Sequence, residues 1–311
     1  MDKPKHISVL LDECIENLNI KPDGIYVDGT LGLGGHSEQI LKRLTSGRLI
    51  GIDRDESAIR RTGERLKEYA GKMTLVHGNF RDVARILEKL GVDGVDGMLF
   101  DLGVSSPQLD EGERGFSYMN DAPLDMRMDD TDALTAWNVV NEWPESELAR
   151  ILRDFGEERF AMRIASRIAE KRLTKPIDTT LELVAVIRSA MPAAALREKQ
   201  HPAKRSFQAI RIAVNDELGA VDEMMRTAPD KLNKGGRLCV ISFHSLEDRI
   251  VKTAIAAREN GCTCPREAPI CTCGFVQTLR NVHRKPIVPG EDELNNNPRS
   301  RSAKLRVAER V

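Results

Sequence analysis

The chain has 311 residues, of which 47 are Lys or Arg, 48 are Asp or Glu, and 41% are hydrophobic. This length and composition support a full hydrophobic core, which excludes a disordered tail, a fibrous repeat and a small disulfide scaffold. The net charge of −1 lacks the basic excess of a general polyanion binder. No apolar stretch approaches the roughly 20 residues of a membrane span and no secretory signal is recognisable, so we expect a cytoplasmic protein without a membrane partner.

Short apolar runs that end in Asp or Gly alternate with amphipathic helical patterns along the first hundred residues. Predicted strands occupy residues 25–28, 49–53, 73–76 and 95–101, and predicted helices occupy residues 38–44, 56–69 and 82–90. This alternation is typical of a doubly wound α/β fold with a parallel sheet. The strand pattern then stops, and it resumes only at residues 236–243 and 303–309.

The interruption predicts two domains. We expect residues 1–105 and 206–311 to form one discontinuous α/β domain, and residues 106–205 to form an inserted helical domain. Charge is segregated within the insertion, since residues 106–158 hold 4 basic and 14 acidic side chains, whereas residues 159–205 hold 11 basic and 4 acidic ones. The near-neutral total is therefore compatible with a nucleic-acid partner that binds local basic surfaces.

The basic half of the insertion contains a row of cations at helical spacing. We call this row the cationic ridge; it consists of Arg159, Arg163, Arg167 and Lys171. Residues four apart share one face of a helix, so the four charges should lie side by side. Two interpretations follow: a solvated face relieved by neighbouring glutamates, or a surface that meets RNA phosphates.

A glycine-rich turn joins the first predicted strand to a helix, in the sequence Asp28-Gly-Thr-Leu-Gly-Leu-Gly-Gly-His-Ser37. Such a turn lets the backbone approach a ligand, and a dinucleotide fingerprint would place another glycine where Ser37 stands. Asp53 ends the second strand and is placed to accept hydrogen bonds from ribose hydroxyls. These features predict an adenosine cofactor without a pyrophosphate and favour S-adenosylmethionine over a nicotinamide dinucleotide. The alternative is a structural turn with an exposed Asp.

Two further strand ends should meet at the same edge of the sheet. Phe80 follows the third strand, where it would flank an adenine, although an aromatic residue at such a position is also compatible with the core. Asp101 ends the fourth strand and opens the sequence Asp101-Leu-Gly-Val-Ser-Ser-Pro-Gln108, near which we expect the reacting methyl group.

Six motifs in chain order resemble the bacterial ribosomal RNA small subunit methyltransferase H family. They are HISVL from His6, DGTLGLGGHS from Asp28, DLGVSSPQ from Asp101, RSFQAIRIAVN from Arg205, FHSLEDR from Phe243 and NPRSRSAKLR from Asn297. The resemblance implies a Rossmann-like class I methyltransferase sheet with an inserted helical substrate-recognition domain. It also implies methyl transfer from S-adenosylmethionine to the N4 amino group of a cytosine of 16S rRNA, in the P-site region of the small ribosomal subunit.

The same resemblance implies a set of cofactor contacts in this chain. By matching motif positions, these are Gly34, Gly35, His36, Asp53, Phe80, Asp101 and Gln108.

The chemistry of an exocyclic amine indicates where the catalytic groups should lie. Its lone pair is delocalised into the ring, so the enzyme must accept an N–H hydrogen bond and align the nitrogen with the methyl donor. We expect the acceptors among Asp101, Ser105, Ser106 and Pro107. Methylation at cytosine C5 would instead need a cysteine in a Pro-Cys arrangement, and no such pair follows a predicted strand.

Other candidate residues allow two interpretations each. Arg211 either contacts RNA or pairs internally with Glu217, and His244 either orients the cytosine or is a hydrogen-bonded structural residue. With Arg159, Arg163 and Arg167, these two residues complete the predicted RNA-binding set.

Four cysteines gather in two Cys-Thr-Cys pairs, while Cys14 and Cys239 lie in apolar sequence and are predicted to be packing residues. Four thiolates suit tetrahedral zinc, although a loop of reduced, unliganded cysteines is the alternative. The predicted metal ligands are Cys262, Cys264, Cys271 and Cys273.

Two other functions compete with the methyltransferase prediction. A nicotinamide dehydrogenase is disfavoured by the incomplete fingerprint at Ser37, and preferential binding of nicotinamide would support it. A noncatalytic ribosome-assembly factor with a vestigial site is disfavoured by the presence of Asp28, Asp53 and Asp101 together with the glycine turn.

Overall fold

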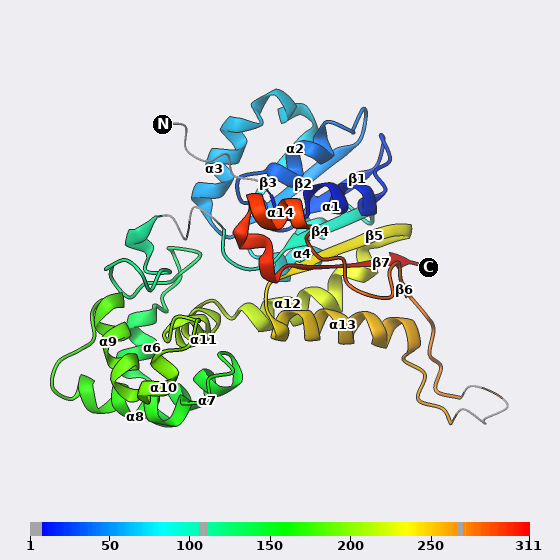
Figure 1. Cartoon of the computed structure of the whole chain (residues 1–311). Helices are drawn as coiled ribbons and strands as arrows, with labels where there is room; N and C mark the ends of the chain where they lie inside the picture. Colours follow the sequence, from blue (N-terminus) through cyan, green and yellow to red (C-terminus); the bar gives the residue numbers. More distant parts are fainter. Residues whose placement is uncertain (1–7, 106–107, 109–110, 266–269, 271) are drawn as a thin grey trace. The chain divides into compact units, whose positions relative to one another are not determined.

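A computed structural model describes residues 8–105, 108, 111–265, 270 and 272–311 (Figure 1). The chain forms two compact units, one made of Met1–Gly103 with Leu218–Val311 and the other of Val104–Glu217. Within the described part of the chain, no helix is both long enough and apolar enough to cross a membrane.

The first unit is built on a mixed sheet, which among the described residues has seven strands in the order β3-β2-β1-β4-β5-β7-β6. Strands β1 to β5 are parallel, and β7 runs antiparallel to both β5 and β6. The strands predicted from the sequence are confirmed, and the short β6 is an addition. Their bounds are β1 (Ile25–Asp28), β2 (Arg48–Asp53), β3 (Met73–His77), β4 (Val95–Asp101), β5 (Leu232–Ser242), β6 (Leu279–Asn281) and β7 (Lys304–Arg310).

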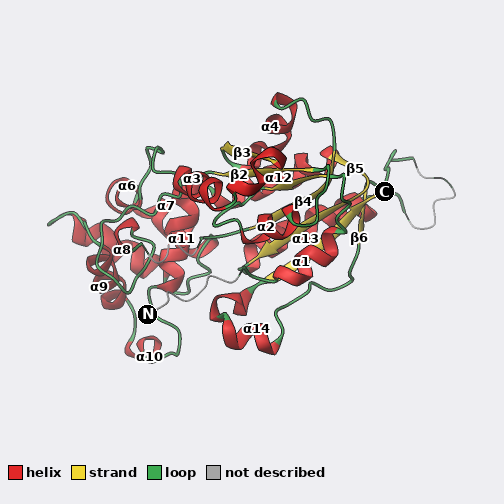
Figure 2. Cartoon of the chain, turned by 90° about the horizontal axis from the view of Figure 1, so that it is seen from above, coloured by secondary structure: helices red, strands yellow, loops and turns green. Residues whose placement is uncertain are grey.

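Helices cover both faces of this sheet, as Figure 2 shows from above. The alternation of strand side chains produces two hydrophobic clusters: Met98 of β4 packs with residues of α4, α12 and α13, whereas its neighbour Leu99 packs with residues of α1 and α2. The fold is therefore Rossmann-like, as predicted. The helices are α1 (Leu11–Leu18), α2 (Gly35–Leu41), α3 (Glu56–Arg65), α4 (Val83–Lys89), α12 (Glu217–Thr227), α13 (Ser245–Asn260) and α14 (Glu291–Asn296).

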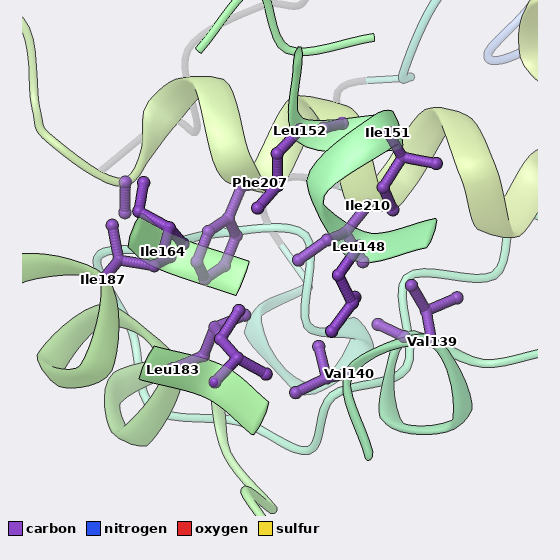
Figure 3. Close-up of a cluster of buried hydrophobic side chains, with 14 of the residues drawn as sticks. Val139, Val140, Leu148, Ile151, Leu152, Ile164, Leu183, Ile187, Phe207 and Ile210 are labelled. Carbon is purple, nitrogen blue, oxygen red and sulfur yellow. The ribbon is translucent and has the colours of Figure 1, made fainter. Parts of the chain in front are cut away.

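The second unit is helical and has a hydrophobic core of its own (Figure 3). Thr135 and Thr179 begin α6 and α9 through capping boxes, in which each threonine side chain and the side chain three residues later bond each other's backbone N–H groups. The helices of this unit are α6 (Ala136–Glu142), α7 (Glu145–Asp154), α8 (Ala161–Arg172), α9 (Thr180–Ala190), α10 (Ala193–Leu196) and α11 (Lys204–Asn215).

The boundary of the helical unit lies later in the chain than the sequence pattern suggested. The pattern assigned residues from 206 onward to the α/β domain, but α11 belongs to the helical unit. Phe207 and Ile210 of α11 are buried at 3% and 0% exposure beside Leu148 and Ile164 (Figure 3). The sequence marks the end of the insertion only by the start of the next strand. An amphipathic helix in the strand-free stretch before that strand is therefore compatible with either domain.

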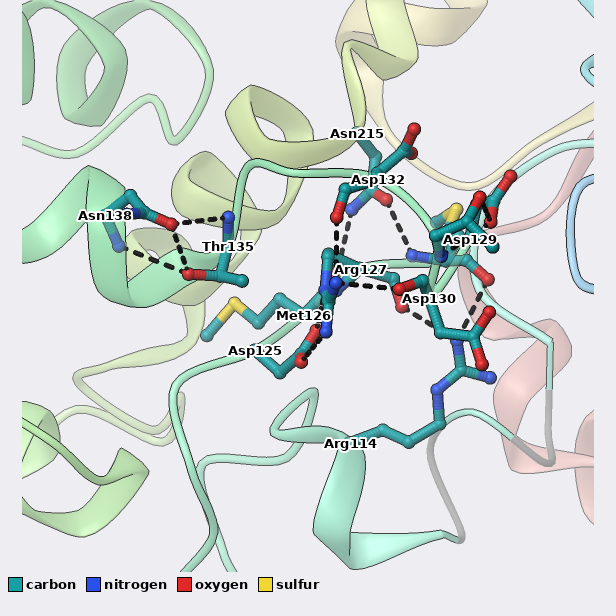
Figure 4. A network of polar contacts seen from close by, with 12 residues as sticks. Arg114, Asp125, Met126, Arg127, Asp129, Asp130, Asp132, Thr135, Asn138 and Asn215 are labelled. Atoms are coloured by element: carbon teal, nitrogen blue, oxygen red, sulfur yellow. Dashed lines mark hydrogen bonds and ion pairs between the residues drawn. The ribbon is translucent and has the colours of Figure 1, made fainter.

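The acidic half of this unit is partly neutralised from within (Figure 4). Arg127 pairs with the Asp125 carboxylate at 2.6 Å and also donates to the backbone carbonyls of Asp130 and Asp132. In the loop of residues 125–132, the side-chain amide of Asn215 from α11 accepts from the Met128 N–H and donates to the Met126 carbonyl. This loop is therefore a structured part of the unit rather than a uniformly solvated acidic surface.

Candidate functional site

The glycine turn after β1 lies close to α3. Gly32 and Gly34 have φ values of +49° and +73°, a backbone conformation that glycine adopts without strain. A Cβ atom at position 34 would lie 2.5 Å from Cγ2 of Thr62. The Thr62 hydroxyl donates to the Gly32 carbonyl at 2.7 Å, so α3 fixes the path of the turn.

Asp28 ends β1 and is almost fully buried beneath this turn. The Ser37 hydroxyl donates to its Oδ2 at 2.6 Å, and the Thr30 N–H donates to its Oδ1 at 3.2 Å. Burial raises the pKa of Asp28 from 3.8 to about 6, although both hydrogen bonds lower it. Ser37 therefore has a definite task at the position where a dinucleotide fingerprint would have glycine: it stabilises the ionised form of Asp28.

Asp53 ends β2 and holds the glycine turn in place. Its Oδ2 accepts a hydrogen bond from the Gly32 N–H at 2.7 Å, and its Oδ1 accepts one from the Asp55 N–H at 2.9 Å. Burial raises the pKa of Asp53 from 3.8 to about 6. Each carboxylate oxygen accepts more than one hydrogen bond, so the side chain retains capacity for ribose hydroxyls.

Asp101 ends β4 and has an unused acceptor. Its backbone N–H donates to Oγ1 of Thr30 at 2.6 Å, whereas its buried Oδ1 has no hydrogen-bond partner among the described residues. Burial and the nearby carboxylates of Asp28 and Glu247 hold the pKa of Asp101 well above 3.8. A buried polar atom without a partner is costly, so this oxygen is suited to a ligand.

The three aspartates come together at the carboxyl edge of the sheet, and we call this cluster the acidic crevice. β1 pairs in register with β2 and β4, so the ends of the three strands come together. For the buried Asp28, a pKa near 6 corresponds to roughly 3 kcal/mol of free energy that opposes its ionisation. A cation bound nearby offsets that energy, whereas a pyrophosphate would add repulsion.

The comparison with known proteins shows which family this chain belongs to. Residues 3–311 match the family described as the MraW methylase family. The chain belongs to this family.

Curated relatives of this MraW-family chain resemble it over nearly its whole length. Two proteins named ribosomal RNA small subunit methyltransferase H are 55% identical (Clostridioides difficile, strain 630) and 56% identical (Brevibacillus brevis). Both alignments span 307 residues and 98% of this chain, with 99% and 98% of the respective relative. Among solved structures, a protein described as a putative rRNA-methylase from Clostridium thermocellum aligns at a TM-score of 0.47 and 11% identity, over 99% of this chain and 100% of that one.

S-adenosylmethionine is the methyl donor of this methylase, and the crevice fits its chemistry. The molecule carries a sulfonium and an ammonium group, which suit an acidic crevice, and its ribose suits Asp53. The unpartnered Oδ1 of Asp101 can accept a hydrogen bond from such a ligand.

Phe80 and His36, the two aromatic candidates for cofactor contacts of this methylase, both contact other residues of the protein. The Phe80 ring packs against Phe100 edge to face, at 6.0 Å between centroids, and is only partly buried. One face of the ring is thus supported by the core, which agrees with both interpretations of Phe80. Nε2 of His36 lies 3.1 Å from the Val9 carbonyl, and His36 is 5% exposed. Its side chain points into the protein.

His244 and Arg211 each lie beside a glutamate in the folded chain. His244 begins α13: its Nδ1 accepts the Glu247 N–H at 3.4 Å, and its Nε2 lies 3.1 Å from the Glu247 carboxylate. Arg211 forms a two-pronged pair with Glu217 at 2.8 and 2.9 Å, and the two side chains are 18% and 7% exposed. The internal partner therefore occupies the guanidinium that the sequence also allowed to reach RNA.

The loop after β4 falls at the start of the second unit. The Ser105 N–H donates to Oε1 of Gln108 at 3.0 Å, and Gln108 is 4% exposed. Ser106 and Pro107, which the sequence singled out as catalytic candidates, lie outside the described residues.

The buried cysteines are packing residues, as predicted. Cys14 and Cys239 belong to the cluster beneath α1 and α2. Burial raises the pKa of Cys14 well above 9.0 and that of Cys239 to about 12. Of the four predicted metal ligands, three thiols lie close together and are treated below, whereas Cys271 lies outside the described residues.

The cationic ridge is exposed on α8 and the residues before it. Ile164 and Ile168, on the opposite side of the helix, are fully buried in the core of the helical unit. Two ridge residues have partners: Arg159 pairs with Glu198 at 2.5 Å, and Arg167 pairs with Glu170 at 2.8 Å. Exposed pairs of this kind contribute only about 0–1 kcal/mol, so a phosphate can replace the carboxylate.

A cleft adjoins the ridge within the helical unit. It brings together hydrogen-bonding groups of both kinds and apolar surface, and the His201 ring in its wall stacks on Tyr118 at 4.5 Å and 13°. Its lining includes Glu158, Arg159, Phe160, Gln200, His201 and Arg205. Sequence reasoning missed this cleft because its residues come from two segments that α8 and α9 separate in the sequence.

Sequence reasoning also missed the residues that support the crevice. Thr30 positions the backbone of Asp101, and Thr62 positions the carbonyl of Gly32. The adjacency of Thr30 to the Asp-Gly pair was an available signal, whereas nothing in the local sequence connects Thr62 to the glycine turn.

Proposed function

We propose that this chain transfers a methyl group from S-adenosylmethionine to the N4 amino group of a cytosine of 16S rRNA, in the P-site region of the small ribosomal subunit. The match to the MraW methylase family from residue 3 to residue 311 carries the proposal. Relatives named small subunit methyltransferase H, identical at 55–56% of positions over nearly the full length, support ribosomal RNA as the substrate.

The crevice residues divide the work of holding the cofactor. Asp53 holds the ribose, the backbone of Gly34 and Gly35 lines the approach, and Phe80 flanks the adenine. When bound, S-adenosylmethionine supplies an electrophilic methyl group on a positively charged sulfur. The buried carboxylates of Asp28 and Asp101 stabilise the positive charge of the ligand and become ionised in doing so.

Asp101 is also our candidate for activating the amine. An ionised carboxylate that accepts an N–H hydrogen bond localises electron density on the nitrogen and prepares it for attack. The free Oδ1 of Asp101 is the described acceptor best suited to this role. Carbonyl and hydroxyl groups of residues 105–107 are the further candidates, and Gln108 remains a candidate cofactor contact.

The thiols of the described residues support attack by nitrogen rather than a covalent mechanism at C5. A C5 methyltransferase uses a thiolate nucleophile, and a raised pKa keeps the buried Cys14 and Cys239 protonated. Cys262, Cys264 and Cys273 lie together beyond α13, in a loop remote in sequence from the strands that form the crevice.

The helical unit is proposed to recognise the RNA. The cationic ridge offers charge to the phosphate backbone, and the adjoining cleft offers donors, acceptors and an aromatic ring to an unstacked base. The acidic loop around Asp125 disfavours indiscriminate binding. Recognition would then depend on a shaped ribosomal site, which is why we propose the assembled subunit as the substrate.

Methylation of isolated subunits tests the reaction and the target together. Subunits from cells that lack the protein are incubated with the enzyme and methyl-labelled S-adenosylmethionine, and the nucleosides are resolved by mass spectrometry. We expect label in N4-methylcytidine from 16S rRNA. Label at C5 of cytidine, or in another RNA only, would overturn the proposal.

A further inference from the structure

The thiols of Cys262, Cys264 and Cys273 gather in the loop that joins α13 to β6. Their Sγ atoms all lie within 4.8 Å of one another, and those of Cys262 and Cys273 are 3.6 Å apart. Two tetrahedral zinc ligands with bonds of about 2.3 Å would place their sulfurs roughly 3.8 Å apart. A disulfide needs about 2.05 Å, so the observed spacing matches coordination and not a bridge.

The loop has few other means of holding this arrangement. Its base is fixed, since the Thr278 N–H donates to the Arg258 carbonyl at 3.0 Å and Arg258 pairs with Asp230 at 2.7 Å. Its apolar residues Ile270 and Val276 are each 74% exposed, and Phe275 is partly buried beside Gly261, so the described residues of the loop form no core of their own. A short segment without a core generally needs a metal or a covalent bridge to keep one conformation.

The backbone near the sulfurs is arranged as it is around metal-bound thiolates. The Thr272 N–H donates to Sγ of Cys264 at 3.3 Å, and the Thr272 hydroxyl lies 3.7 Å from the same sulfur. Hydrogen bonds of this kind orient a thiolate ligand and stabilise its charge.

We propose that Cys262, Cys264 and Cys273 bind one zinc ion that fixes the loop between α13 and β6. The three thiols coordinate as thiolates after releasing their protons to solvent, and the fourth position takes water or another donor. This structural site is separate from methyl transfer, and no electron transfer is involved.

Metal analysis of the full-length protein tests the proposal. The protein is dialysed against zinc under a phosphine reductant, and bound metal is measured by mass spectrometry; cobalt is then substituted to reveal thiolate-to-metal absorption. We expect about one zinc per wild-type chain and an intense cobalt–thiolate band. Both should be lost in Cys262→Ser and Cys273→Ser and retained in Thr263→Ala, a matched change between two of the ligands.

Limited proteolysis provides a second readout that does not depend on the variants folding identically. Zinc should slow cleavage within residues 261–278 of the wild type and leave cleavage of Cys273→Ser unchanged. Wild-type protein that keeps no zinc after dialysis, equal zinc in the serine variants, or a Cys262–Cys273 disulfide under the same reductant would each overturn the proposal.

Discussion

Replacing Asp53 by Ala gives a direct view of how the crevice holds its cofactor. The change removes the acceptor for the Gly32 N–H at 2.7 Å and for the Asp55 N–H at 2.9 Å, together with the proposed partner of the ribose. Hydrogen bonds to a charged group contribute about 1.5–3 kcal/mol, and the alanine leaves the ribose hydroxyls without this partner. We expect a loss of about 1–3 kcal/mol in cofactor binding, or roughly a 5- to 150-fold rise in Kd.

Two companion variants separate cofactor binding from local stability. Asp53→Asn keeps one acceptor oxygen without the charge, so its Kd should fall between those of the wild type and Asp53→Ala. Asp55→Ala removes the side chain that caps α3 through the Ser57 N–H at 2.9 Å, which should cost about 1 kcal/mol of stability. Its Kd should stay at the wild-type value.

Titration calorimetry with S-adenosylmethionine and S-adenosylhomocysteine measures these constants, and thermal unfolding checks that each variant is folded. A folded Asp53→Ala protein with the wild-type Kd would refute the ribose assignment. An Asp55→Ala protein that loses affinity to the same degree would show that any loosening of α3 is sufficient.

Four further predictions concern charge and backbone geometry. Asp28 and Asp53, with pKa values of about 6, must both ionise to receive a cation, so cofactor Kd should rise about tenfold for each group, or about a hundredfold together, from pH 7 to pH 5; a flat profile would contradict this. In the ligand-free fold Asp28 and Asp53 bind more protons than in the unfolded chain between about pH 4 and pH 6, so their contribution to the unfolding free energy should decrease as pH rises through that window; denaturant titrations should show this as a pH-dependent difference between the wild type and Asp53→Asn. Gly34→Ala should lose stability and cofactor affinity, whereas Gly91→Ala, at φ +65° with nothing within 4 Å, should cost only about 1–2 kcal/mol of stability; equal effects in calorimetry and thermal unfolding would refute the close approach at Gly34. Replacing three arginines of the cationic ridge with Gln should weaken RNA binding and reduce its salt-dependence slope by about 2, as measured by filter binding at several salt concentrations. The control replaces three exposed lysines of the α/β unit with Gln: Lys67, Lys89 and Lys234. This change should have little effect on RNA binding, and an effect equal to that of the arginine variant would make the ridge an ordinary solvated face.

Much of the crevice could be predicted because parallel strands impose it. Once residues 25–28, 49–53 and 95–101 are recognised as strands of one parallel sheet, their final aspartates must meet at one edge. The sequence also showed that Ser37 stands where a dinucleotide fingerprint has glycine, although the bond from Ser37 to Asp28 is visible only in the structure.

Side-chain choices that depend on distant partners could not be predicted. The sequence allowed Arg211 either to pair with Glu217 or to reach RNA. Only the fold shows that the guanidinium donates two hydrogen bonds to the Glu217 carboxylate. His36 follows the glycines and resembles a ligand contact, yet its ring meets the Val9 carbonyl. The boundary of the helical unit also escaped prediction, because the apolar face of α11 is compatible with either unit until its contacts are known.

Mass-spectrometric mapping of methylated cytidines in 16S rRNA tests whether this chain methylates N4 of a cytosine in cells. RNA from cells with and without the protein is compared, and the deficient cells are complemented with the wild type or with Asp101→Ala. We expect that one N4-methyl mark in the P-site region disappears without the protein and returns with the wild type but not with Asp101→Ala. An unchanged set of N4-methylcytidines in cells that lack the protein would contradict it.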